Sequence, residues 1–226
     1  VSESLKTMRL EQIDVFFLHS QIIFDDYVFP GSLADTQEQW SVTQQCFDDA
    51  VRPAFEDLKA RGLIKAWGIT GTGHPDAIEA VLRSEHKPDV VQIATNLLDS
   101  PGSLKRYLEP ARPRRLIQIA AERDIGVMGI RAVQAGALTT AFDRRIGPHH
   151  PEMQDFERAA PFRALCKQWG NDPAVIAHRY ALTMTGVDTV VLGVKNRQEL
   201  LACLGGAEPL EPEQMNEIDA LGLQRL

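Results

Sequence analysis

The chain has 226 residues, of which 44% are hydrophobic, and a formal net charge of −7 at pH 7. This length suits one domain with a sizeable core, the acidic balance argues against a nucleic-acid surface, and no apolar run reaches the roughly 18 residues of a membrane span. The three cysteines are far apart and odd in number, which argues against a disulfide framework or a zinc site and favours a reduced, cytoplasmic protein.

Short apolar runs alternate with amphipathic patterns along the chain. Runs typical of buried parallel strands cover 13–18, 63–70, 90–94, 125–130 and 187–193. Helical spacing predicts helices over 47–61, 75–84, 113–123, 159–169, 172–185, 197–204 and 211–221. This alternation predicts a parallel α/β sheet, either doubly wound or part of a (β/α)8 barrel. No Gly-x-Gly-x-x-Gly follows any of these runs, which weakens the dinucleotide-binding doubly wound alternative.

Polar residues follow each predicted strand. They are His19, Thr70 with Gly71, Gln92 with Asn96, Arg131, and the turn from Gly193 to Asn196. In a barrel, residues just past the C-terminal ends of the strands build the active site. We therefore favour a single barrel domain over residues 1–226, with these residues in its site.

A long insertion from 20 to 45 interrupts the alternation after the first strand. It carries Tyr27, Phe29 and Trp40, and long loops without regular structure are commonly lids or binding loops. Because strand-to-helix loops lie on the active face, we expect these three aromatic residues to line a substrate pocket. The alternative is a surface loop that binds nothing.

Five segments, in the same order along the chain, resemble the aldo-keto reductases. They are Ser4-Leu-Lys-Thr-Met to His19, Leu58-Lys-Ala-Arg-Gly to Thr70, Val91-Gln-Ile-Ala-Thr-Asn96, Gly126 to Thr139, and Val191-Leu-Gly-Val-Lys-Asn-Arg-Gln-Glu-Leu200. They are similar to the family's strands four to eight with their adjoining turns. The resemblance covers essentially the whole chain and implies a TIM barrel, of which about five of the eight strand–helix units are present.

The resemblance also implies which catalytic groups this sequence contains. In the family, strands one to three carry the Asp, the Tyr general acid and the Lys of a catalytic tetrad, and that material precedes the segments matched here. Only the tetrad's histidine has a counterpart, which is His19. We therefore expect an N-terminally truncated barrel that is inactive by itself, because about five strands cannot close an eight-stranded barrel. Tyr27 is the candidate nearest to His19 for a replacement proton donor, and packing is its simpler role.

The remaining matched residues are expected to bind a nicotinamide cofactor. Thr70 and Gln92 suit a carboxamide, the backbone at Ala135 and Gly136 suits a pyrophosphate, and Lys195 suits a 2′-phosphate. The full expected set is Thr70, Gly71, Gln92, Ile130, Arg131, Gln134, Ala135, Gly136, Leu138, Gly193, Lys195, Asn196, Glu199 and Cys203. The alternative for Lys195 and Asn196 is an ordinary helix N-cap, which is compatible with an anion site.

Some positions depart from the family's pattern. Ile130 stands where an aromatic residue often stacks on the nicotinamide, and Ala202 and Cys203 align with the pair that reads adenine. The departure leaves cofactor preference open, although Lys195 favours NADP(H) over NAD(H). The His149-His150 pair has no further ligand nearby in the sequence, so we expect no metal site.

These observations predict an NADP-dependent oxidoreductase that interconverts small aldehydes or ketones and alcohols in its full-length form. His19 would donate a hydrogen bond to the carbonyl oxygen, although its simpler role is to cap a strand. One alternative is a non-catalytic nicotinamide-binding module, as the resemblance to potassium-channel β-subunits allows. A further alternative is a barrel lyase or epimerase that uses His19 as a base. The sequence indicates neither the substrate nor the oligomeric state.

Overall fold

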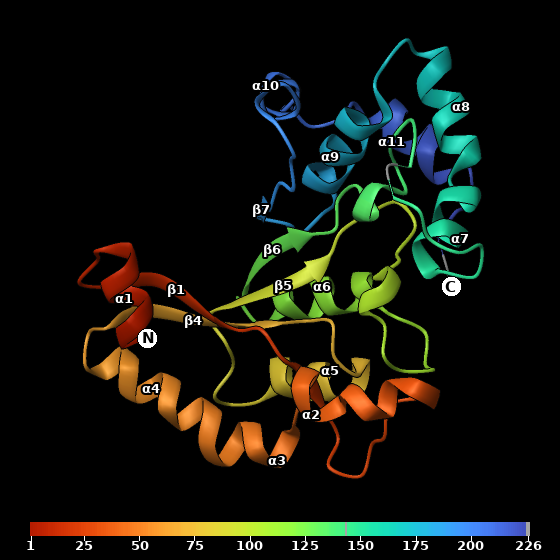
Figure 1. Ribbon diagram of the computed structural model, residues 1–226. Helices are drawn as coiled ribbons and strands as arrows, with labels where there is room; N and C mark the ends of the chain where they lie inside the picture. Colours follow the sequence, from red (N-terminus) through yellow and green to blue (C-terminus); the bar gives the residue numbers. More distant parts are fainter. Residues whose placement is uncertain (143, 225–226) are drawn as a thin grey trace.

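The computed structural model describes residues 1–142 and 144–224. Its centre is a five-stranded parallel sheet (Figure 1). The strands are β1 (Ile13–Leu18), β4 (Ile64–Thr70), β5 (Val90–Ala94), β6 (Gly126–Ile130) and β7 (Thr189–Val190), and their spatial order is their chain order. The predicted parallel α/β sheet is confirmed. The last strand is two residues long and therefore much shorter than predicted.

Three helices lie along one side of this sheet: α4 (Arg52–Ala60), α5 (Pro75–Arg83) and α6 (Pro113–Glu122) (Figure 1). In α5, buried Ala77, Ile78, Val81 and Leu82 recur at helical spacing. This spacing produces one apolar stripe that packs on the sheet. A proline opens each of these helices in its first turn, where the missing N–H costs no hydrogen bond.

The core beneath α4 is aromatic. Trp67 on β4 is 1% exposed, and its ring stacks on that of Phe55 from α4 at 5.5 Å between centroids. Its indole N–H donates to the Glu56 carboxylate at 2.7 Å, which satisfies the one polar atom that the ring buries. Phe47, in the π-helical stretch Phe47–Val51 just before α4, packs on the same ring. These contacts fix the helix predicted over 47–61.

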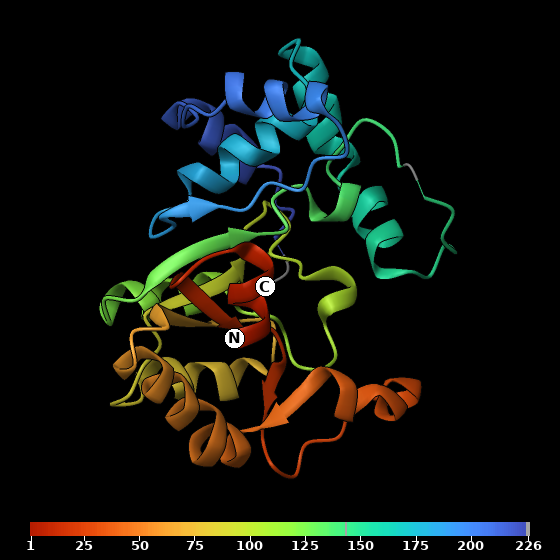
Figure 2. The ribbon, with the colours of Figure 1, turned by 60° about the vertical axis from the view of Figure 1, so that its left-hand side comes forward.

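The remaining helices gather around β7 and beyond it, at the end of the molecule far from β1 (Figure 2). They are α7 (Pro151–Arg158), α8 (Ala160–Gln168), α9 (Pro173–Thr183), α10 (Arg197–Gly205) and α11 (Pro212–Asp219). Tyr180 of α9 ties this group to α6, because its hydroxyl accepts from Arg114 at 2.7 Å and donates to Asp219 at 2.6 Å. The sequence pattern predicted α8 to α11, but it missed α7.

We expected the insertion over 20–45 to be a loop without regular structure, and this expectation is wrong. The insertion contains β2 (Gln21–Ile23), a 3₁₀ turn (Gly31–Thr36), α2 (Gln37–Trp40) and β3 (Ser41–Thr43), and the two strands pair in parallel. The backbone N–H of His74 donates to the Ile22 carbonyl at 3.0 Å, so the insertion is bound to the turn after β4. A seven-residue helix, α1 (Ser2–Met8), precedes β1, and α3 (Gln44–Cys46) follows β3. None of the described residues forms a helix with the length and apolar character needed to cross a bilayer.

Candidate active site

A cavity of about 730 Å³ lies beside the C-terminal ends of β6 and β7. One wall is the loop that follows β6, and the other is formed by α9, α10 and the segment after β7. Eight of the predicted cofactor residues line it: Ile130, Arg131, Ala135, Gly136, Gly193, Lys195, Glu199 and Cys203. The cavity volume lies within the range of about 300–1,000 Å³ typical of small-molecule sites.

The loop after β6 has an unusual backbone. Arg131, Gln134 and Ala135 have φ values of 60°, 46° and 51°, and Gly136 has a φ of 97°. Glycine adopts such values freely, whereas each other residue type is strained there. Strain of this kind persists where surrounding contacts hold the backbone in place.

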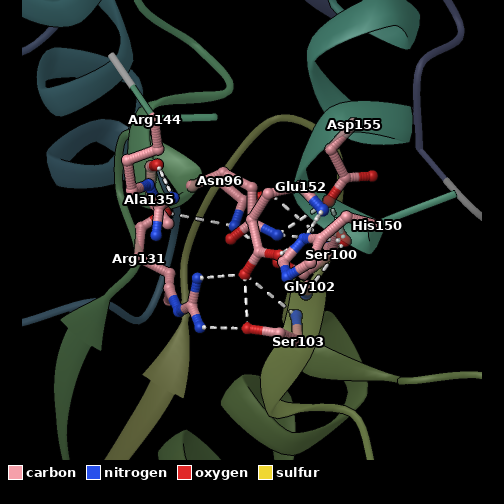
Figure 3. Close-up of polar contacts among 11 residues, drawn as sticks. Asn96, Ser100, Gly102, Ser103, Arg131, Ala135, Arg144, His150, Glu152 and Asp155 are labelled. Carbon is pink, nitrogen blue, oxygen red and sulfur yellow. Dashed lines mark hydrogen bonds and ion pairs between the residues drawn. The ribbon is translucent and has the colours of Figure 1, made fainter. Parts of the chain in front are cut away.

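A network of buried polar side chains supplies those contacts (Figure 3). Glu152, on α7 and 1% exposed, accepts from Arg131 at 3.1 Å and from the hydroxyl and N–H of Ser103 at 2.5 and 3.1 Å. His150 Nδ1 lies 2.6 Å from its second oxygen. Burial raises the pKa of Glu152, but the hydrogen bonds from Ser103 and Arg131 outweigh burial and hold the pKa at about 2. The carboxylate is therefore charged and fixes the Arg131 guanidinium.

A second carboxylate extends the network along α7. Asp155, also 1% exposed, accepts from Ser100 at 2.5 Å and from Gln134 at 2.7 Å. Asn96, after β5, donates to the Arg131 carbonyl at 3.2 Å and accepts from the Ser100 N–H at 3.2 Å. These bonds join the loop after β5, the loop after β6 and α7 into one unit (Figure 3).

Two further predicted residues, Gln134 and Leu138, do not line the cavity. Gln134 is fully buried, with its amide turned to Ser100 and Asp155. Leu138 is fully buried in the hydrophobic core. Both side chains point into the protein and not into the cavity. A contact of either residue with a cofactor stays a prediction.

On the opposite wall of the cavity, Asn196 caps the N-terminus of α10. The Asn196 side chain accepts from the Glu199 N–H at 2.9 Å, and the Glu199 carboxylate accepts from the Lys195 N–H at 2.8 Å. Asn196 thus serves as the cap of α10, which places the N-terminus of this nine-residue helix beside the cavity. Unsatisfied N–H groups at a helix N-terminus favour an anion.

The predicted residues at the first three strand ends form a separate group. Thr70 and Gln92 are register partners on β4 and β5, and the Thr70 hydroxyl donates to the Gln92 amide oxygen at 3.4 Å. The Gly71 N–H donates to the Gln92 carbonyl at 2.7 Å. His19 follows β1, the neighbour of β4, and is exposed. These residues lie at the same end of the sheet as the loop after β6 but do not line the cavity.

The three aromatic residues predicted for a substrate pocket do not line the cavity either. Phe29 is 2% exposed and packs inside the insertion. The Tyr27 hydroxyl donates to Glu109 at 3.3 Å and accepts from the Leu108 N–H at 3.3 Å, so it is already engaged. Trp40 is 40% exposed. Their role in substrate binding stays a prediction.

Three residues important to this geometry were not predicted. Glu152 lies on the unpredicted helix α7. Arg144 precedes this helix, and its guanidinium donates to the Ala135 carbonyl at 2.5 Å. His178 lines the cavity from α9. It interrupts the apolar run Val175-Ile-Ala-His178, and an isolated histidine in such a run was the only available signal.

Comparison with known proteins agrees with this fold. The family model described as "Aldo/keto reductase family" matches residues 1–222, and the chain therefore belongs to the aldo-keto reductase family of oxidoreductases, whose fold is the (β/α)8 barrel. No curated protein sequence matches significantly.

Two solved structures are similar in fold. They are the holo and apo forms of aldo-keto reductase AKR11C1 from Bacillus halodurans, with TM-scores of 0.65 and 0.64 and sequence identities of 21% and 20%. Each match covers 97% of this chain, and the chain spans 64% and 65% of the length of those structures. At this identity the likeness concerns the fold.

Proposed function

We propose that the cavity binds NADP(H) and that the protein containing this chain interconverts a small carbonyl compound and its alcohol. One observation carries the proposal. Eight residues expected to contact a nicotinamide cofactor come from two segments, 130–136 and 193–203, and all of them line one cavity. NAD(H) is the alternative cofactor.

The chemistry of the cavity wall fits a dinucleotide phosphate. The turn at Ala135 and Gly136, with the Arg144 guanidinium beside it, suits a pyrophosphate because small residues allow a close approach and a cation favours an anion. The Gly136 N–H itself donates to the Val133 carbonyl at 3.0 Å. Lys195 and the α10 N-terminus offer a second anion site at the opposite wall. Ile130 and Val133 supply apolar contact, which suits the face of a ring. Arg131 is already paired with Glu152 and would position the loop.

The strand-end group suits the reacting carbonyl. When bound, a reduced nicotinamide supplies the hydride. The His19 imidazole would donate a hydrogen bond to the carbonyl oxygen and orient it. Thr70 and Gln92, with their polar atoms 3.4 Å apart, would present paired donor and acceptor groups to a carboxamide.

Fluorescence titration with NADPH and NADH tests the proposal. We expect saturable binding of NADPH, and for Lys195→Ala a Kd for NADPH about tenfold higher with an almost unchanged Kd for NADH, since one charge-assisted contact is lost. Lys6→Ala, an exposed lysine on α1, is the matched control. Binding of neither nucleotide would contradict the proposal and favour a lyase or epimerase. Tight binding without turnover by the full-length form, which would carry the family's Tyr and Lys, would favour a non-catalytic nicotinamide-binding module.

A further inference from the structure

His178 lies at the end of the cavity formed by α9 and α10. Its neighbours in the cavity wall include the small or apolar Ala174, Val175, Ala202 and Cys203, and the carboxylates of Asp172 and Glu199 line the same cavity. The side chain is 5% exposed, so its polar atoms face either protein or the cavity. In Figures 1 and 2, α9 and α10 lie far from β1, which precedes His19.

The hydrogen bonding of His178 fixes its tautomer. Nδ1 lies 2.8 Å from the Ala174 carbonyl oxygen and 3.6 Å from the Cys203 sulfur. A carbonyl oxygen only accepts, so Nδ1 carries the hydrogen. Burial lowers the pKa of His178, and this influence exceeds the opposing ones of the Ala174 carbonyl and of Asp172. The ring is therefore neutral, and Nε2 presents a lone pair.

Nε2 is the nitrogen available to a ligand. Within residues 1–142 and 144–224, no protein atom forms a hydrogen bond with Nε2, and it is not among the fully buried atoms that lack a partner. Because His178 lines the cavity and is otherwise buried, the cavity is the side from which a ligand can reach Nε2. An acceptor in this largely enclosed wall suits a flat heterocycle that carries an N–H donor, because a ligand that left the acceptor unpaired would lose free energy.

We infer that His178 determines nucleobase specificity, with Nε2 accepting a hydrogen bond from the exocyclic amine of adenine. This inference rests on the proposed function, since it takes the bound molecule to be a nicotinamide dinucleotide with its adenine between α9 and α10. The Ala174 carbonyl gives the inference its selectivity. It keeps the hydrogen on Nδ1. Nε2 therefore accepts a hydrogen bond from a donor on the ligand and repels an acceptor at the same place.

The test compares NADPH with its reduced hypoxanthine analogue, in which a carbonyl oxygen replaces the exocyclic amine. We expect the wild-type protein to bind NADPH about tenfold more tightly than the analogue, since a hydrogen bond is exchanged for two facing acceptors. His178→Leu should weaken NADPH binding about tenfold and abolish the preference. His86→Leu, at an exposed histidine after α5, should leave both Kd values unchanged.

The outcomes separate the two proposals. Equal binding of NADPH and the analogue by the wild-type protein would overturn the role of His178 while leaving the proposed function intact. A preference that persists in His178→Leu would do the same. Failure of the wild-type protein to bind either nucleotide would overturn the proposed function itself. The wild-type comparison needs no variant, so it decides the matter even if His178→Leu fails to fold.

Discussion

Arg131 and Glu152 form an ion pair with 3.1 Å between nitrogen and oxygen, although they lie 21 residues apart on two sides of a long connection. The arginine backbone is left-handed, and its guanidinium lines the cavity, whereas the carboxylate behind it is 1% exposed. The pair therefore holds a strained loop against α7 (Figure 3), and the cavity wall is set before any ligand arrives.

The first prediction concerns this pair. Glu152→Gln keeps the shape of the side chain but leaves the Arg131 charge without its buried partner, so we expect the free energy of unfolding to fall by about 3 kcal/mol. Urea unfolding measures it. Glu157→Gln, at an exposed position on the same helix, should change stability by less than about 0.5 kcal/mol. Equal stability of the Glu152 variant and the wild-type protein would show that the pair does not hold the loop.

Lowering the pH should remove the contribution of the Glu152 carboxylate to the free energy of unfolding. The pKa of Glu152 falls from 4.5 to about 2 on folding, so its stabilisation is fully present above pH 4.5 and is lost as the pH falls towards 2. The shift corresponds to about 3 kcal/mol. Urea midpoints of the wild-type protein and Glu152→Gln should therefore converge between pH 4.5 and 2. A constant difference across that range would contradict the assignment.

The docking of the insertion depends on Gly73. A Cβ there would overlap the Ile22 carbonyl oxygen and lie 2.7 Å from the Ile22 nitrogen, and neither backbone atom can move without breaking the bond from His74. Gly73→Ala should destabilise the protein by about 2 kcal/mol and increase proteolysis within 20–45. Gly205→Ala, where a Cβ meets no atom within 4 Å, is the control. Unchanged proteolysis of Gly73→Ala would mean that the insertion is held elsewhere.

The proposed role of His19 predicts a selective loss of turnover. In the full-length form, His19→Ala should lower kcat for a model aldehyde about 100-fold, because one hydrogen bond to the reacting oxygen is removed. The Kd for NADPH should stay the same, since His19 does not line the cavity. His86→Ala provides the comparison at an exposed histidine. Turnover equal to that of the wild-type protein would remove His19 from the mechanism.

Most of the sheet and its helices could be predicted because their signals are local. The strand over Ile13–Leu18 and the helices near Pro75 and Pro113 begin and end close to the predicted residues. An apolar run, or a proline in the first turn of a helix, depends only on residues within that strand or helix. Contacts with distant parts of the chain therefore do not change what it predicts. The strand predicted over 187–193 is shorter because only Thr189 and Val190 pair with β6.

The insertion could not be predicted because its order comes from distant contacts. Ile22 pairs with Val42, 20 residues away, and bonds to the turn at His74. The Tyr27 ring meets that of His74 edge to face, with 4.8 Å between centroids, and its hydroxyl donates to Glu109, 82 residues away. No local pattern in 20–45 specifies these partners.

Eight of the predicted cofactor residues lie together in the two cavity walls, whereas the residues that support these walls were not predicted. Ala135 and Gly136 are small residues in a recognisable turn, whereas the left-handed backbone at Gln134 follows from bonds made by its buried amide. In the sequence, Glu152 resembles an ordinary charged residue on an exposed helix. Only the packing of α7 against the loop after β6 shows that it is buried. His178 reads equally well as a core histidine, and the cavity beside it decides between the two interpretations.

Under the proposed function, a cavity divided between two walls that are distant in sequence would link this protein's lifetime to its supply of dinucleotide. The α10 wall exposes Leu200, Leu201 and Leu204 by 37%, 56% and 57%, so little apolar packing holds that helix. A dinucleotide spanning both walls would add about 2.7 kcal/mol of stability at a concentration 100 times its Kd. Cellular proteases cleave the opened state, so a shortage of dinucleotide would shorten the half-life of the chain and lower its abundance.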